Sequence, residues 1–225
     1  MKPARINKHP KSTTIQVTKL KLDTRSKILK AAIEMFADAG YENTSLRQIT
    51  NQAGVNHGSI KYHFNNKEEL WRESVAFLYA QMEGAFNLSD TRWDSMSTLD
   101  KIEFSMRTYI RYVAKHPEFF KITMMETLYN SSRLEWLAEN ITIPYTRESL
   151  ALVKQAKSEG IYSPNIPDMN LFYLLIAASR YVFFLAPEIG RVFGKDMTSD
   201  LEIKRHEDAV VELFLGHLKP KIGGV

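Results

Sequence analysis

The chain of 225 residues contains no cysteine. This absence excludes a disulfide framework, a cysteine nucleophile, thiolate-bound zinc and iron–sulfur clusters, and it suits the reducing cytoplasm in which we expect the protein to act. Residues 1–22 lack the apolar core of a signal peptide. The longest apolar stretch, Leu171–Pro187, contains Arg180 and is shorter than the roughly 20 residues of a membrane span. We therefore expect no membrane partner.

Signatures of catalysis and of metal binding are also missing. The sequence has no phosphate-binding loop, no nucleophile–base pattern and no His-x-x-x-His pair, and its six histidines lack the spacing of metal ligands. We expect no catalytic residue, no metal and no cofactor, which makes an enzyme the least favoured class of function.

Acidic residues are absent from residues 1–22, which hold six basic ones. Residues 1–70 carry a net charge of +6, whereas residues 71–225 carry −2. A basic N-terminal third on a nearly neutral body indicates a polyanionic partner for that third. For residues 1–22 alone, a flexible and solvated extension is the favoured interpretation.

What the sequence does contain is helical periodicity along nearly its whole length, and no segment alternates like a β-strand. We predict an all-α fold. Pro144 is expected to interrupt the seventh helix, and Asp168 is expected to cap the eighth. The expected helices span residues 24–39, 46–52, 57–64, 67–86, 97–115, 117–129, 133–159, 168–186 and 199–217.

The first three helices have the spacing of a helix-turn-helix unit. Gly54 permits the left-handed backbone of a tight turn between the second and third helices. Ile49, Val55 and Ile60 are spaced to pack these helices on each other and on the first one. The third helix then lies exposed and can enter a major groove, with Gly58 at its start allowing close approach of the backbone.

Several of these segments together resemble the tetracycline-repressor (TetR) family of bacterial transcriptional regulators. The resemblance covers residues 24–71 and includes Gly40-Tyr41 upstream of the turn. The other matching segments are Thr44–Ile49, Ala53–Val55, Gly58–Phe64 and Asn66–Leu70. It implies a DNA-binding regulator, usually a repressor, with an N-terminal DNA-binding domain on a larger helical domain that binds a ligand and dimerises.

Carried over position by position, the resemblance also implies which side chains contact DNA. The expected phosphate contacts are Thr44 or Ser45, Tyr62, His63 and Lys67. The residues expected to read base edges are Arg47, His57, Ser59 and Lys61, beside Gly58. Lys61 stands where the family most often has Tyr, and Asn56 and His57 also depart from the common residues. These departures concern which operator is read. The structural alternatives are that Tyr62 packs on the fourth helix, that His63 lies in the core and that His57 points to solvent.

The body is rich in aromatic residues and methionine, which either fill a core or line an adaptable pocket. Arg180 lies inside an apolar helix and needs a counter-charge or an anionic ligand. We expect a small, apolar or aromatic effector. The candidate ligand-binding residues are Phe104, Tyr109, Tyr112, Phe120, Met124, Trp136, Tyr145, Phe172, Arg180 and Phe183.

The last two long helices are candidates for a dimer interface. The helix over residues 168–186 is apolar nearly all round, which the surface of a monomer does not tolerate. The last helix carries its own apolar stripe. We therefore expect a homodimer on a palindromic DNA operator, with residues 1–22 as the extension, 23–70 as the DNA-binding domain and 71–225 as the ligand-binding and dimerisation domain. A body that docks a protein partner instead of a small molecule is the alternative.

Overall fold

The computed structural model describes residues 24–86 and 90–218. All regular structure in these ranges is helical, so the predicted all-α fold is confirmed. The basic extension expected at residues 1–22 lies outside the described residues.

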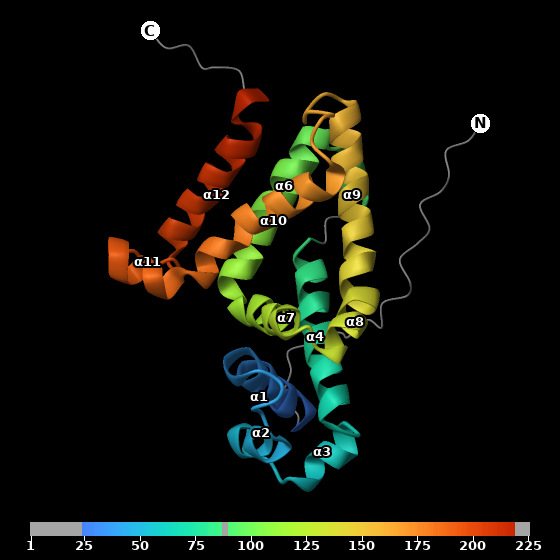
Figure 1. Ribbon diagram of the computed structural model, residues 1–225, viewed down its shortest axis with the longest axis vertical. Coiled ribbons are helices and arrows are strands. Elements are labelled where there is room, and N and C mark those ends of the chain that lie inside the picture. The colour runs from blue at the N-terminus through green and yellow to red at the C-terminus, as the bar shows by residue number, and fades with distance from the viewer. Residues whose placement is uncertain (1–23, 87–89, 219–225) are drawn as a thin grey trace, which may run out of the picture.

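Three short helices form one end of the molecule, shown in blue and cyan in Figure 1. They are α1 (Thr24–Ala39), α2 (Leu46–Ala53) and α3 (Gly58–His63). Their shared core includes Ile28, Phe36, Ile49, Ile60 and Phe64, each at most 2% exposed. We call this end the head.

The fourth helix, α4 (Lys67–Ala85), runs from the head into the body. The expected domain boundary after residue 70 therefore lies inside a continuous helix. The other helices are α5 (Asp90–Ser95), α6 (Thr98–Lys115), α7 (Pro117–Tyr129), α8 (Ser132–Leu137), α9 (Ile143–Ser158), α10 (Asp168–Phe184), α11 (Ala186–Phe193) and α12 (Asp200–Leu215). In the body, α6 packs against α10 and α12, and α7 lies next to α1.

Two helices were not expected, α5 and α11. The expected helix over residues 168–186 instead ends at Phe184, and Leu185 has a non-helical ψ of 5°. Pro187 lies in the first turn of α11, where its missing N–H costs nothing, whereas it could not have continued α10. Asp168 was also expected to cap α10, but Pro167 holds that position. Asp168 instead accepts a hydrogen bond from Lys157 Nζ at 2.6 Å.

The interruption expected at Pro144 is a π-helical turn just before it, Ala138–Thr142. The Ile143 N–H bonds the carbonyl of Ala138, five residues back. The backbone keeps right-handed helical angles at both ends of this turn, and Pro144 falls in the first turn of α9. Helices α8 and α9 are therefore parts of one continuous rod.

No single helix in the described part of the chain is long and apolar enough to cross a membrane. Helices α10 and α11 meet the criteria of length and composition only as a pair, and they are bent by 64° relative to each other.

Candidate DNA-binding and effector sites

The start of α2 and the turn after it are fixed by local hydrogen bonds. The Ser45 hydroxyl accepts a bond from the Gln48 N–H at 3.2 Å, and Gln48 Oε1 accepts one from the Ser45 N–H at 2.8 Å. This is a capping box. Gly54 closes the helix with a φ of 65°, a left-handed conformation that favours glycine. The capping box fixes the start of α2, and the turn at Gly54 ends the helix before the chain continues to α3.

Thr44 has a structural role in this arrangement. It is 1% exposed, and its hydroxyl lies 2.8 Å from the Gly40 carbonyl and 3.2 Å from the Met35 carbonyl. A phosphate contact would require breaking these bonds. Of the two alternatives considered from the sequence, Ser45 is the one exposed to solvent, although its hydroxyl also donates to Gln48 Oε1 at 2.7 Å.

The outer surface of α3 is polar and open. Tyr62 is 85% exposed, so it does not pack against α4; its ring instead meets that of His63 edge to face, 4.8 Å between centroids. His63 and Ser59 are half-buried, and Lys61 is exposed. Arg47 on α2, together with His57 and Gly58 at the start of α3, is exposed as well. The residues expected at a DNA interface therefore lie on or beside one helix.

Lys67 is the first residue of α4 and is half-buried. Its Nζ lies 4.1 Å from the centroid of the Tyr41 ring. Burial lowers the pKa of this lysine below its usual value. Lys67 thus combines a place at a helix N-terminus, where anions are favoured, with an aromatic neighbour that restricts its side chain.

The candidate ligand-binding residues do not line one common wall. Trp136 packs on Trp71 with centroids 5.7 Å apart, and Phe183 packs on His206 at 5.3 Å. The Tyr112 hydroxyl donates a bond to the Leu78 carbonyl at 2.6 Å, which commits it to the α4–α6 contact. Other candidates also meet rings outside the expected set: Phe104 meets Trp93 at 6.3 Å and Phe172 meets Tyr173 at 5.2 Å.

A smaller group of candidates does meet inside the body. The Arg180 Cζ lies 4.4 Å from the centroid of the Phe120 ring. Burial raises the pKa of Tyr109, and the charge and hydrogen bonding of Arg180 act in the opposite direction. Burial also raises the pKa of Tyr145, whose ring meets that of Tyr79 edge to face at 5.8 Å. Met124 is half-buried. This group joins helices α4, α6, α7, α9 and α10.

Arg180 differs from Arg107 and Arg111 in its partners. Arg107 pairs with Glu103 at 2.9 Å and Asp208 at 2.7 Å. Arg111 makes two bonds, of 2.7 and 2.8 Å, to Glu207. Within the described ranges, no carboxylate lies within 4.0 Å of Arg180. The salt bridge considered from the sequence is therefore not formed within one chain by these residues.

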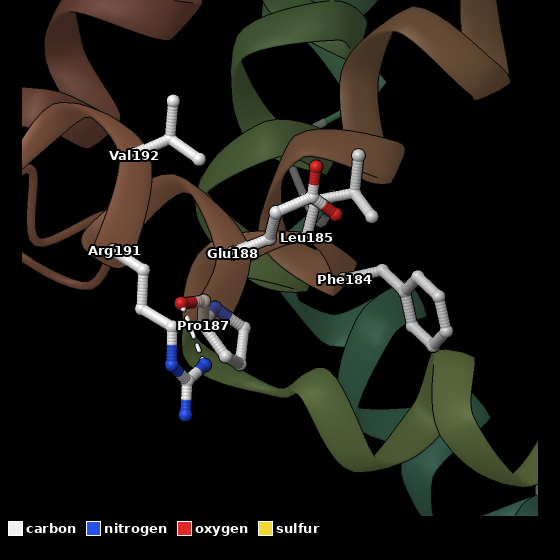
Figure 2. Close-up of a pocket in the computed structure, with 6 residues that line it drawn as sticks. All are labelled: Phe184, Leu185, Pro187, Glu188, Arg191 and Val192. Carbon is white, nitrogen blue, oxygen red and sulfur yellow. Dashed lines mark hydrogen bonds between the residues drawn. The ribbon is translucent and has the colours of Figure 1, made fainter.

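Two pockets lie outside that group. One, of about 420 Å³, is open to the surface at the α10–α11 corner, and Figure 2 shows Arg191 folded back onto the Pro187 carbonyl at 3.0 Å. Its lining residues are Phe184, Leu185, Pro187, Glu188, Arg191 and Val192. The other, of about 230 Å³, lies between α6 and α12. None of the ten ligand candidates lines either pocket.

Large apolar side chains are exposed on one group of helices, α10 to α12. The side chains of this group are between 44% and 72% exposed. Single apolar residues on the surface of a monomer are normal, whereas a group of them marks an interaction site. The group comprises Met169, Tyr173, Leu174, Tyr181 and Phe184 on α10, Val192 and Phe193 on α11, and Leu201 and Leu213 on α12. We call these residues the C-terminal apolar face.

Comparison with known proteins agrees with the geometry of the head. Residues 28–73 match the family described as bacterial regulatory proteins, tetR family, and residues 99–214 match the tetracyclin repressor-like C-terminal domain. The HTH-type transcriptional repressor NicS of Pseudomonas putida is 32% identical over 172 residues, which cover 71% of this chain and 75% of that protein. The HTH-type transcriptional regulator RutR of Escherichia coli is 23% identical over 86% of this chain and 90% of its own length.

The fold is also similar to that of the fatty acid degradation regulator FadR from Bacillus halodurans. The TM-score is 0.61 at 16% identity, and the match covers 84% of this chain and 95% of that one. Three observations lead to one conclusion: the exposed third helix of the head follows a glycine turn, both family regions match, and one relative is 32% identical. The chain belongs to the TetR family of bacterial transcriptional regulators.

Proposed function

We propose that the protein is a cytoplasmic repressor that binds a palindromic operator as a homodimer and leaves it when a small effector binds the body. The observation that carries this proposal is the open polar surface of α3 on a tightly packed head. Arg47, His57, Ser59 and Lys61 would read base edges, and Ser45, Tyr62, His63 and Lys67 would contact phosphates. Gly58 would let the backbone come close.

The proposed dimer uses the C-terminal apolar face. Pairing two copies through α10 and α12 would remove these large side chains from water, at about 25 cal/mol for each Å² buried. A two-fold axis there would present two heads to the two halves of a palindrome. The α10–α11 pocket shown in Figure 2 borders the same face, since Phe184 and Val192 belong to both.

The proposed effector is small, largely apolar or aromatic, and carries one acidic group. Arg107 and Arg111 are already paired with carboxylates, whereas Arg180 has none within 4.0 Å among the described residues, so we assign Arg180 to the acidic group. The Phe120 ring and the Tyr109 hydroxyl beside it offer an apolar wall and a hydrogen-bond donor. Such a site would orient the ligand with few polar groups and gain affinity from burial.

A two-step experiment tests this function. A duplex is first selected from random DNA with the full-length protein, and a palindromic consensus is expected. Fatty acids, aromatic acids and their uncharged alcohols are then tested for thermal stabilisation of the protein and for release of that duplex. Acids that do both support the proposal. Failure to select any preferred DNA sequence would contradict it.

The alternative is a DNA-binding regulator whose body docks a protein partner. The observation that favours it is the packing of the candidate ligand residues against neighbouring rings, while none of them lines either of the two pockets described above. If every compound in the panel fails to stabilise the protein while operator binding is intact, this alternative replaces the effector.

A further inference from the structure

One arginine of the body reaches into the head. Arg133 belongs to α8, and its side chain is only 11% exposed. Its Cζ lies 3.7 Å from the centroid of the Tyr41 ring, and its terminal nitrogen lies 3.2 Å from Glu42 Oε1. Tyr41 and Glu42 form part of the loop between α1 and α2. The body thus contacts the loop that joins the first two helices of the head.

A buried carboxylate fixes this arginine. Glu126 of α7 is 3% exposed, and its Oε2 accepts a bond from Arg133 Nε at 3.1 Å. The Ser131 hydroxyl donates to the same oxygen. A buried acceptor with these two donors holds the guanidinium in one position, because leaving the carboxylate unpaired would cost several kcal/mol. The position of Arg133 is therefore set by the body.

The Tyr41 ring connects Arg133 with Lys67. Nζ of Lys67 and Cζ of Arg133 lie 4.1 and 3.7 Å from the same ring centroid. A cation over an aromatic face is attracted by the electrons of the ring. Lys67 is thereby restricted in position while its ammonium group can still attract a phosphate. Any movement of Tyr41 would move the lysine or release it.

We propose that Glu126, Arg133 and Tyr41 form a clamp that positions Lys67 for a phosphate of bound DNA. The inference rests on the proposed phosphate contact of Lys67. Arg133 and Tyr41 are positioning residues that act through the lysine. Holding the lysine in place before binding reduces the side-chain entropy that is lost when the phosphate contact forms.

The test compares full-length variants on the selected duplex over a range of salt concentrations. Lys67→Met should weaken binding and lower the salt slope by about 1.8, the value for two phosphates, one for each protomer of the proposed dimer. Tyr41→Leu should weaken binding roughly two- to tenfold, the cost of ordering one long side chain on binding. Tyr41→Phe keeps the ring and is the matched control, which should bind like the unaltered protein.

The decisive measurement is the double variant Tyr41→Leu/Lys67→Met. If Tyr41 acts through Lys67, the double variant binds no more weakly than Lys67→Met alone. If the two effects multiply, Tyr41 acts independently and the positioning role is wrong, although the phosphate contact of Lys67 stands. If Lys67→Met changes neither affinity nor salt slope, the proposed contact itself is wrong and the clamp falls with it.

A second variant tests Arg133 without stranding a buried charge. Arg133→Met combined with Glu126→Met removes both members of the ion pair, a change that is often tolerated when it is made in pairs. Circular dichroism checks that the protein is folded. We expect this double variant to bind DNA more weakly than the unaltered protein. When Lys67→Met is already present, the same two substitutions should weaken binding no further. Unchanged binding by the folded variant would overturn the role of Arg133.

Discussion

The exposed side chains of α3 differ in what they can distinguish on DNA. Phosphates are the same at every step, so a side chain that contacts one contributes affinity and no sequence preference. A lysine at a base edge can select guanine through its O6 and N7 atoms. Tyr62 and Lys61 are neighbours, both are exposed, and they are assigned to these two classes.

Replacing each of these residues should therefore have a different effect. Lys61→Ala should relax the preference at one or two half-site positions, at a cost of roughly 1–3 kcal/mol, whereas Tyr62→Phe should weaken binding to all sequences alike. Mobility-shift titrations on a half-site library measure both effects. A sequence profile unchanged by Lys61→Ala would show that another residue reads those bases.

Arg180 is the second residue for which one substitution gives a clear answer. Arg180→Gln should abolish stabilisation by acidic ligands while leaving that by the matching alcohols, because only the acids need the cation. Thermal shift with paired acids and alcohols measures the difference. Arg191→Gln, at the surface pocket, is the control and should respond like the unaltered protein. If Arg180→Gln reduces thermal stabilisation by acids and by alcohols equally, Arg180 supports the packing of the body and does not contact the ligand.

Some roles of single residues could be predicted from the sequence, and others could not. The turn at Gly54 follows from the left-handed backbone that it needs. The burial of Thr44 could not be seen, because its hydroxyl is committed to carbonyls of the preceding loop and helix. The contact of Tyr41 with Arg133 joins residues that are 92 positions apart, and no local pattern reports it.

At the scale of helices, serine caps and one proline mark several starts correctly, although the cap expected at Asp168 is wrong. Ser97 and Ser199 cap α6 and α12, and Pro117 starts α7, which is why these ends lie close to the expected positions. The short helices α5 and α11 have too few turns to show a periodicity. The apolar character of residues 168–186 obscured the end of α10 at Phe184.

The same apolar character leads to a prediction about α10. Leu174 and Tyr181 are 55% and 49% exposed in the single chain, so Leu174→Glu/Tyr181→Glu should leave the protomer folded. In the proposed dimer the new charges would be buried and unpaired, at a cost of several kcal/mol. Analytical ultracentrifugation should find monomers, and operator binding should be lost.

The control lies on another helix. Leu128 on α7 is 71% exposed, and Leu128→Glu should remain dimeric because this residue is not part of the C-terminal apolar face. A dimeric Leu174→Glu/Tyr181→Glu variant that still binds the operator would rule out α10 as the interface.

At the scale of the whole molecule, one histidine links stability to pH. His206 lies between α12 and α10, with Nε2 2.9 Å from the Ala178 carbonyl. Burial lowers its pKa, although hydrogen bonds to the backbone and the charge of Glu207 act in the opposite direction. The stability that depends on the neutral ring is complete above the ordinary value of about 6.5 and declines as the pH falls below it.

Urea unfolding should therefore give a lower midpoint at pH 5.5 than at pH 7.5. His206→Gln should reduce this difference, since an amide can still donate to the Ala178 carbonyl and does not titrate in this range. His217→Gln alters an exposed residue and serves as the control. An equal pH dependence in all three proteins would assign the effect to other groups.

The π-helical turn at Ala138–Thr142 has a consequence for how the chain tolerates changes of length. A turn that holds one residue more than an α-helical turn absorbs that residue without rotating the helices on either side. Deleting the exposed Asn140 should therefore keep α8 and α9 in the same helical phase, with Arg133 still facing Tyr41 and Tyr145 still facing Tyr79. The deletion must be combined with Pro144→Ala, because the proline ring would clash inside a regular helix.

Deleting the equally exposed Lys154 of α9 in the same background instead removes about 100° of rotation from a regular helix. The deletion should rotate the part of α9 after residue 154 relative to the part before it, so that their buried faces no longer align. It should therefore lower the melting temperature far more than the deletion of Asn140 does. If both deletions cost the same, the turn does not compensate for length. A rod with this property can lose one residue and leave the contacts at both of its ends unchanged.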